Sequence, residues 1–430
     1  MLNMKRAGMA VILAVALLSI SAATVIAGES GKIKPSARNL TLQVNAAASI
    51  YADMFNKLAR TFEAQNPGIR ISMDTTARSQ SVAFQKTLRL AVVDDLPDVS
   101  FQGPNHLRYL KNNGYIQALD TWINADPEWT KDRFSPSVTQ STKIGGQTMG
   151  LGVGFSFPII YYNVELVKEA RNGVPTLPGD WKGILSLAEK IKGLHPDILG
   201  IYARFQSFYS QGLIRSLGGR LGNESGTMAT LSEPGTLAGI RIFQQIGALG
   251  QAENAMTGDQ ARQAFSAGKT AIHLDSSSSL RRFLKQSKGR FELGTAPLPL
   301  GENGELSTSG FAIVMHTKDP RQKSAAWRFM KFVAGPEGQA ILGSETGFVP
   351  GNEIPVETPD LLGDYYAAIP QIKAVLDSIP YAGPWYLFKG PNNKRIGSLF
   401  DTYMERVVMQ EITPENAALK LTRDINALIE

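Results

Sequence analysis

The residue types that most often carry chemistry are scarce or poorly spaced in this chain. The sequence has no cysteine, which excludes disulfides, thiol catalysis, iron–sulfur clusters and cysteine-based zinc sites. Its four histidines are His106, His195, His273 and His316, and no two of them stand three or four residues apart. Paired metal ligands on one helix face need that spacing. We therefore interpret the histidines as surface or strand residues and expect no metal site.

Motifs for nucleophiles and nucleotides are absent or broken. No G-x-S-x-G sequence occurs, so the turn that exposes a serine nucleophile in α/β hydrolases is missing. Residues 268–270 (GKT) resemble the end of a phosphate-binding loop, but Gln263 stands where its first glycine belongs. Gly152 and Gly154 begin a dinucleotide-binding pattern in which Phe157 replaces the third glycine. We expect no cofactor.

The acidic residues Asp94, Asp95 and Asp98 cluster around Pro97. Such a cluster is more typical of a solvated loop than of a binding site, although it could touch a cation or a partner. A glycoside hydrolase would need two carboxylates that face one cleft, and nothing in the sequence favours such a pair.

Hydroxyl and aromatic side chains offer a different chemistry, the recognition of a sugar-like molecule. The serine run 276–279 directly follows a buried strand predicted at 271–274, and hydroxyls at the carboxyl end of a strand are well placed to meet a ligand. Sugar rings present flat C–H faces that lie on aromatic rings. Trp385 stands in a turn with Gly383 and Pro384, which favours its exposure. The candidate stacking residues are Trp181, Phe205, Phe208, Tyr209, Trp385 and Tyr386.

The elements that would position these side chains alternate between strand and helix. Residues 40–44 alternate apolar and polar like a strand, and apolar residues of 51–62 recur at helical spacing. Asn66-Pro67-Gly68 ends that helix, and 69–73 alternates again. A strand–helix–strand unit of this length predicts a parallel sheet. Further strands are predicted at 97–101, 271–274 and 311–315, and a last helix from Thr413-Pro414. At 430 residues, this α/β pattern is expected to form two lobes.

The first 27 residues predict a cleaved export signal. Lys5 and Arg6 precede an apolar run at 7–18, and small residues end at Ala27, after which we expect cleavage. Residues 28–39 read as a flexible leader. A lipoprotein needs a cysteine at its cleavage site, so the exported protein is expected to lack a lipid anchor and to reside in the periplasm. An uncleaved membrane anchor is the alternative.

The composition is that of a folded protein with a mild positive charge. Hydrophobic residues make up 43% of the chain, enough for sizeable cores. The formal net charge is +6, but the basic residues are scattered, which disfavours nucleic acid as a partner.

Several stretches together resemble the solute-binding proteins of bacterial ABC importers, family 1, in the branch that serves sugars and glycerol 3-phosphate. The resemblance extends from about Leu40 to the C-terminus. The matching stretches are 62–69 (FEAQNPGI), 161–163 (YYN), 178–181 (PGDW), 265–272 (FSAGKTAI), 332–340 (FVAGPEGQA) and 347–350 (GFVP). Their order and spacing over nearly the whole chain are specific to this family.

The resemblance implies a two-lobed α/β fold of the type II periplasmic binding proteins, with discontinuous lobes and a ligand cleft between them. Transferred to this sequence, lobe I comprises 40–152 plus 298–352, and lobe II comprises 153–297 plus 353–430. Glycine-permissive chain at 150–154 and the segment 295–300 suit crossings between lobes.

Site residues follow from the resemblance where motifs match. Ser156 matches a serine that contacts ligand, Gln102 stands nearest to an acid of the family, and Phe348 keeps the ring of a tyrosine but loses its hydroxyl. Around the second strand, Ser79 and Ser81 are candidates, and Gln80 between them is not assigned. With the stacking candidates, the implied ligand-binding residues are Gln102, Ser156, Trp181, Ser276, Ser277, Gly310, Phe348, Trp385 and Arg395; Ser278 is an alternative to Ser276 and Ser277.

The resemblance also implies function. The chain is expected to bind a carbohydrate, polyol or glycerol phosphate in the cleft as a monomer, without catalysis, and to deliver it to permease subunits in the inner membrane. Hydroxyls of the ligand would pair with Ser156, Ser277 and Gln102, and Arg395 would pair with a phosphate or carboxylate. The alternatives are another solute, such as a peptide or polyamine, and an extracytoplasmic glycoside hydrolase.

Overall fold

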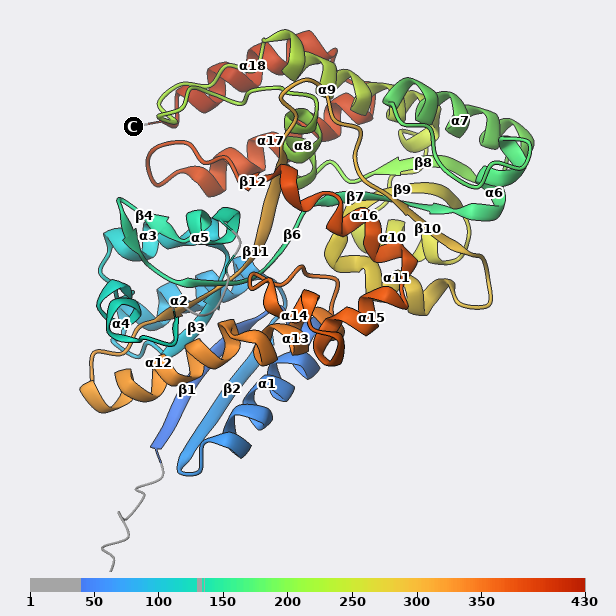
Figure 1. The fold of residues 1–430 in the computed structure, drawn as a ribbon. Coiled ribbons are helices and arrows are strands. Elements are labelled where there is room, and N and C mark those ends of the chain that lie inside the picture. Colours follow the sequence, from blue (N-terminus) through green and yellow to red (C-terminus); the bar gives the residue numbers. More distant parts are fainter. Residues whose placement is uncertain (1–39, 130–133, 135, 430) are drawn as a thin grey trace, which may run out of the picture. The chain divides into compact units, whose positions relative to one another are not determined.

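The computed structural model describes residues 40–129, 134 and 136–429, which belong to one compact unit (Figure 1). The predicted signal peptide (1–27) and leader (28–39) lie outside the described residues. Within the described part, every helix is too short or too polar to cross a membrane.

The described residues form a mixed α/β fold. The strands are β1 (Leu40–Ala47), β2 (Ile69–Ala77), β3 (Val99–Gln102), β4 (Lys143–Ile144), β5 (Gln147–Thr148), β6 (Leu151–Ser156), β7 (Pro158–Asn163), β8 (Leu199–Ala203), β9 (Thr270–Ser276), β10 (Leu293–Ala296), β11 (Leu306–Met315) and β12 (Ala382–Pro384). The α-helices are α1 (Ala52–Gln65), α2 (Gln80–Val92), α3 (Leu107–Asn112), α4 (Asp120–Ala125), α5 (Pro136–Ser141), α6 (Val164–Ala170), α7 (Trp181–Leu194), α8 (Ser207–Ser216), α9 (Pro234–Ile246), α10 (Gly258–Ser266), α11 (Leu280–Ser287), α12 (Pro320–Ala334), α13 (Pro336–Glu345), α14 (Ile354–Glu357), α15 (Asp364–Ala367), α16 (Lys373–Leu376), α17 (Asn393–Val408) and α18 (Pro414–Asn426).

The larger sheet has the order β12-β11-β3-β1-β2, with β6 also paired to β11. Strands β1, β2 and β3 are parallel, as the strand–helix–strand pattern predicted. The later strand β11 runs antiparallel to β3 and β6. We call the part of the molecule around β1, β2, β3, β6 and the later residues of β11 lobe I. Strand β12, which pairs with the first residues of β11 (306–308), is counted with lobe II.

The smaller sheet has the order β10-β7-β9-β8, and we call the part around it lobe II. Strand β8 is parallel to β9, whereas β7 is antiparallel to both β9 and β10. Every residue of β7, β8 and β9 is buried, which explains why these strands read as nearly continuous apolar runs. The limits of the lobes derived from the resemblance stay a prediction.

Helix α1 shows how the sequence builds these layers. Met54, Phe55, Leu58 and Phe62 recur at helical spacing and are all buried. The helix ends at Gln65 with Asn66 as its C-cap, and Gly68 follows at a positive φ of 95°. Its apolar face covers the lobe I sheet, where Phe55 packs 4.7 Å from the ring of Phe101. The predicted helix and its stop are confirmed.

The prediction that the acidic cluster lies in a solvated loop is wrong for Asp98. Asp94 and Asp95 are exposed, as expected, but Asp98 is buried where β1 and β3 pair. Its Oδ2 accepts a hydrogen bond from the Gln43 amide at 2.8 Å, and its backbone carbonyl accepts one from His316. The carboxylate satisfies a strand amide, which local sequence could not reveal.

Two strands pass between the lobes side by side. Strand β6 leads through Phe157 into β7 of lobe II, and β11 begins after the segment that leaves β10 (Figure 1). A side chain at Gly310 would clash with the Gly154 carbonyl on the paired strand. Glycine is therefore required where the crossing strands approach each other.

His316 makes the fold sensitive to acid. The buried ring bridges two polar groups, with Nδ1 2.7 Å from the Tyr115 carbonyl and Nε2 2.7 Å from the Ser100 hydroxyl. Burial lowers the pKa of His316 to about 4. A histidine in the unfolded chain has a pKa near 6.5. Between pH 6.5 and about 4, the unfolded chain therefore binds a proton at this residue that the folded chain does not bind.

We predict that stability is lost as pH falls from about 6.5 to about 4, by up to about 3 kcal/mol from His316 alone. Urea unfolding across this range measures the slope. His316→Gln should flatten the profile, because glutamine takes up no proton in either the folded or the unfolded chain. Equal slopes for the wild type and His316→Gln would contradict the prediction.

Candidate functional site

A cavity of about 1160 Å³ lies between the lobes. Its lobe I wall comes from residues that follow β2 and β3, at 79–84 and 105–113. Its other wall comes from residues that follow β8 and β12, at 206–211 and 385–401. Carboxyl ends of strands are the usual place for ligands in α/β folds. The volume exceeds the range of roughly 300–1,000 Å³ typical of pockets for small molecules.

The start of α2 builds one side of the lobe I wall. The Ser79 side chain caps the helix by accepting a hydrogen bond from the Val82 amide at 3.3 Å. Gln80 Nε2 donates to the Gly310 carbonyl at 2.8 Å, which ties the helix start to the crossing strand β11. A side chain at Gly103 would clash with Asn105 Oδ1 and lie 2.7 Å from Gln80 Oε1. This glycine lets two amide oxygens gather at the end of β3.

His106 and Phe84 form an aromatic surface on the same wall. Their rings stack with centroids 4.1 Å apart and planes 11° from parallel. Burial, and then the positive charge of Lys394, lowers the pKa of His106 to about 4, so the ring is neutral at pH 7. Its Nδ1 atom is buried and has no hydrogen-bond partner among the described residues. This leaves a polar ring atom unused at the wall.

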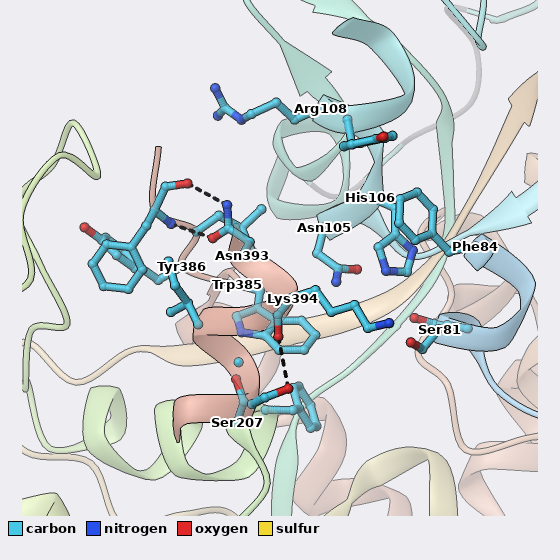
Figure 2. Close-up of a pocket in the computed structure, with 18 of the residues that line it drawn as sticks. Ser81, Phe84, Asn105, His106, Arg108, Ser207, Trp385, Tyr386, Asn393 and Lys394 are labelled. Carbon is cyan, nitrogen blue, oxygen red and sulfur yellow. Dashed lines mark hydrogen bonds between the residues drawn. The ribbon is translucent and has the colours of Figure 1, made fainter. Parts of the chain in front are cut away.

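The lobe II wall carries a second aromatic surface. Phe208, in the first turn of α8, meets Trp385 edge to face with centroids 5.7 Å apart. Tyr209 packs against Phe208 at 5.1 Å. Asp401 accepts a hydrogen bond from the Ser207 amide at the start of α8. Ser207 and Trp385 are labelled in Figure 2. Burial raises the pKa of Asp401.

A buried carboxylate holds this wall in place from behind. Asp275 lies at the end of β9 with no exposed surface, and the Tyr209 hydroxyl donates to its Oδ1 at 2.9 Å. Arg262 Nε donates to Oδ2 at 2.6 Å, and Arg204 lies 3.4 Å from Oδ1. Burial by itself would raise the pKa of Asp275, but Arg204, His273 and Arg262 outweigh it and hold that pKa well below its usual range. The aromatic ring of Tyr209 is thereby fixed at the cavity.

Of the nine ligand-binding residues implied by the resemblance, Trp385 lines the cavity. The further candidates Ser79 and Ser81 line it as well, and so does Gln80, which was not assigned. The stacking candidates Phe208, Tyr209 and Tyr386 line it too. Phe205 is buried and lies outside the lining.

Three predicted polar contacts make side-chain hydrogen bonds within the protein, although Gln102 Oε1 is buried without a partner among the described residues. Gln102 Nε2 donates to Thr87 Oγ1 and Ser100 Oγ, at 3.0 and 2.9 Å. The Ser156 hydroxyl donates to the Ser309 carbonyl at 3.3 Å. The Ser277 hydroxyl accepts a hydrogen bond from the Phe157 amide at 3.4 Å. All three are buried and none lines the cavity.

The remaining predicted contacts also lie outside the cavity lining. Ser276 Oγ pairs with Ser278 Oγ at 2.8 Å. Trp181 is buried at the start of α7, and Phe348 packs against Tyr51 and Phe311. The Gly310 carbonyl accepts a hydrogen bond from Gln80, which lines the cavity. The role of these residues as ligand contacts stays a prediction.

Sequence reasoning missed Asn105, His106 and Lys394, and a signal existed for each. Asn105 and His106 follow β3 directly, the same kind of position that pointed to the serines after β9. Lys394 is adjacent to Arg395, which is exposed and does not line the cavity. Successive helix residues point about 100° apart, so a match off by one residue selects the wrong face.

The described residues contain no group of three or more histidine and acidic side chains placed to hold a metal ion. Among the residues that line the cavity, Asp401 carries the only carboxylate. The arrangement offers aromatic surfaces, amides, hydroxyls and cations, which are means of holding a molecule.

A family model described as bacterial extracellular solute-binding protein matches residues 57–371. The chain belongs to this family. Its members bind small molecules and work with ABC transporters, and they are binding proteins rather than enzymes.

Relatives of this solute-binding protein are distant in sequence. A binding protein of Brucella abortus is 24% identical over 336 residues, which cover 76% of this chain and 78% of that protein. The maltodextrin-binding protein MdxE of Bacillus subtilis is 22% identical over 362 residues, with 79% and 80% covered. The structure of UgpB from Mycobacterium tuberculosis in complex with glycerophosphocholine aligns with a TM-score of 0.78 at 19% identity, covering 90% of this chain and 97% of that one. This likeness confirms the predicted two-lobed periplasmic-binding-protein fold.

We predict that Asp275→Asn destabilises the solute-binding protein by about 3–5 kcal/mol, because it leaves the largely buried Arg204 and Arg262 without the carboxylate of a fully buried partner. Urea unfolding at pH 7 measures the loss. Asp259→Asn is the matched control: it removes another carboxylate partner of Arg262, but that carboxylate is 80% exposed. The control should change stability by less than about 0.5 kcal/mol. Equal effects of the two substitutions would contradict this account.

Proposed function

We propose that this chain is the periplasmic solute-binding component of an ABC importer and captures a carbohydrate, polyol or glycerol phosphate between its lobes. The ligand is held without being transformed, and the loaded protein delivers it to permease subunits in the inner membrane. The protein acts as a monomer, exported by the signal peptide predicted at 1–27 and not lipid-anchored.

The observation that carries this proposal is the pair of aromatic surfaces on opposite walls of one cavity. Phe84 with His106 lies on lobe I, and Phe208 with Trp385 lies on lobe II. Sugar and polyol C–H faces pack on such rings, while Asn105 and Gln80 offer amide groups to hydroxyls. Because the two walls belong to different lobes, a ligand that touches both favours the closed arrangement of the lobes.

The known ligands of similar proteins support this class. MdxE is a maltodextrin-binding protein, and the aligned UgpB structure contains glycerophosphocholine. Both are hydroxyl-bearing molecules. The cavity has room for a molecule larger than a single sugar ring.

The competing functions are less well supported by the lining. A polyamine needs carboxylates, and the lining offers Asp401 against the cations Arg108, Lys389 and Lys394. A glycoside hydrolase needs a second carboxylate beside Asp401. A peptide stays an alternative ligand, which a binding screen distinguishes.

Calorimetric titration of purified protein, unfolded and refolded to remove retained ligand, tests the ligand class. The panel contains maltodextrins, polyols, glycerol 3-phosphate and glycerophosphocholine, with a tripeptide and spermidine as competitors. We expect binding within the first group. Binding of the tripeptide or spermidine alone, by a folded protein, would contradict the proposal.

Trp385→Ala is predicted to weaken binding of the ligand so identified by about tenfold or more, because the ligand loses an aromatic contact worth about 0.5–1.5 kcal/mol beyond its buried area. Tyr381→Ala is the matched control, since Tyr381 is 48% exposed and does not line the cavity. The Tyr381→Ala variant should bind the ligand with the same affinity as the wild type. Equal affinities of both variants would remove Trp385 from the site.

A further inference from the structure

Three of the longer helices, α2, α8 and α17, begin at the cavity, and their first turns differ in charge. The amino end of an α-helix carries partial positive charge on its unpaired amides. At α8 this charge has a partner within the chain, because Asp401 accepts a hydrogen bond from the Ser207 amide. The first turns of α2 and α17 contain no acidic residue. Two positive helix ends therefore face the cavity without a carboxylate of their own.

Lys394 increases this imbalance. It lies in the first turn of α17, where a cation opposes the helix dipole, and Arg395 adds a second cation to the same turn. None of the carboxylates in the described part of the chain lies within salt-bridge distance of Lys394. Figure 2 shows its side chain extending from α17 across the cavity toward Ser81 and His106 of lobe I. An ammonium group lies there without a counter-ion among the described residues.

His106 supplies an independent sign of a missing partner. In the described part of the chain, its buried Nδ1 atom at the cavity wall has no hydrogen-bond partner, although buried polar atoms are nearly always paired. The ring is close enough to Lys394 to feel its charge. A neutral imidazole with the proton on Nδ1 can donate a hydrogen bond to an anion. The residue is thus suited to an oxygen of a bound group.

Other charged residues of the cavity lining also favour an anionic ligand. Arg108 and Lys389 also line the cavity, and neither is paired with a described carboxylate. Asp401 is the opposing charge, and its hydrogen bond to α8 already occupies it. The free cavity therefore has a surplus of cations.

We propose that Lys394, His106 and the amino end of α2 together hold an anionic group of the ligand, a phosphate ester or a carboxylate. This inference rests on the proposed function, because it concerns the same cavity, and it selects the anionic members of the ligand class. Ser81, in the first turn of α2, adds a hydroxyl donor. Charge-assisted hydrogen bonds of this kind are the strong ones in proteins.

The arrangement also couples the anion to closure of the lobes. Lys394 belongs to α17, whose apolar face is part of the lobe II core, whereas α2 follows β2 of lobe I. An anion bound by both joins the lobes across the cavity. A neutral ligand of the same size lacks this link. The contacts of the anionic group with both lobes therefore stabilise the closed arrangement of the lobes and not the open one.

Calorimetric titration of Lys394→Gln tests the site, with Lys420→Gln as the matched control, because Lys420 is an exposed lysine on α18 outside the cavity. The probes are glycerol 3-phosphate, glycerophosphocholine and galacturonate, with glycerol and maltotriose as neutral counterparts. We expect the wild type and Lys420→Gln to bind an anionic probe equally. Lys394→Gln should bind it about 10- to 100-fold more weakly, the loss of a charged hydrogen bond. High salt should weaken the wild type more than Lys394→Gln.

A second variant keeps the test independent of folding defects. Ser81→Asp places a carboxylate at the amino end of α2, where it stabilises the helix and takes the place of the ligand's anion. We expect a higher melting temperature for the ligand-free protein and weaker binding of the anionic probe. Unchanged affinity for that probe in Ser81→Asp, or equal affinities of Lys394→Gln and Lys420→Gln, would overturn the inference.

The screen separates this inference from the proposed function. Binding of maltotriose or glycerol without any anionic probe overturns the anion site and leaves the proposed function standing. Binding of no probe by folded protein overturns both. Among the anionic probes, the phosphate esters and galacturonate distinguish a phosphate from a carboxylate.

Discussion

The close pairing of β6 with β11 is the constraint on which the rest of the molecule depends. These strands belong to the lobe I sheet, yet β6 continues directly into β7 of lobe II and β11 begins after β10 of lobe II. Gly154 and Gly310 allow the backbones to approach, because a side chain at Gly310 would strike the Gly154 carbonyl. The cavity lies next to this crossing, since Ser309 of β11 is part of its lining and Gln80 is bonded to Gly310.

Charged side chains are paired behind the lobe II wall and unpaired in front of it, within the described residues. Behind the wall, Asp275 is surrounded by Arg204, Arg262 and the Tyr209 hydroxyl, so the buried ion is fully compensated. In front of it, Lys394 faces the cavity with no carboxylate within reach among the described residues. The compensated cluster around Asp275 fixes the position of Tyr209. The uncompensated charge of Lys394 can still form an ion pair with a ligand. The same residue types therefore serve rigidity in one place and recognition in the other.

Local patterns predicted the elements well because they depend on neighbours in sequence. The apolar spacing of Met54, Phe55, Leu58 and Phe62 fixed α1, and the alternation of 40–44 fixed β1. Asp98 shows the limit of such patterns. It looked like a loop carboxylate beside Pro97, but pairing of β1 with β3 brings it to the Gln43 amide, 55 residues away. Contacts of this kind depend on strand pairing, which no local window contains.

The site was harder to predict than the fold for a related reason. Ser156 and Gln102 stand at the ends of strands, as a ligand contact should. However, the Ser156 hydroxyl is directed to Ser309, and the Gln102 amide nitrogen to Thr87 and Ser100. Trp385 was found because its turn chemistry favoured exposure, and Lys394 was missed because one step along α17 turns a side chain to another face.

Sequence alone determined the family, the alternation of strands and helices, and the aromatic and hydroxyl-rich character of the chain, since these reside in residue types and their spacing. Only the tertiary structure decided which polar groups are used up inside the protein and which remain for a ligand. Hydrogen bonds and ion pairs join residues far apart in sequence, and a side chain's chemistry is available only when its partners within the fold have been counted.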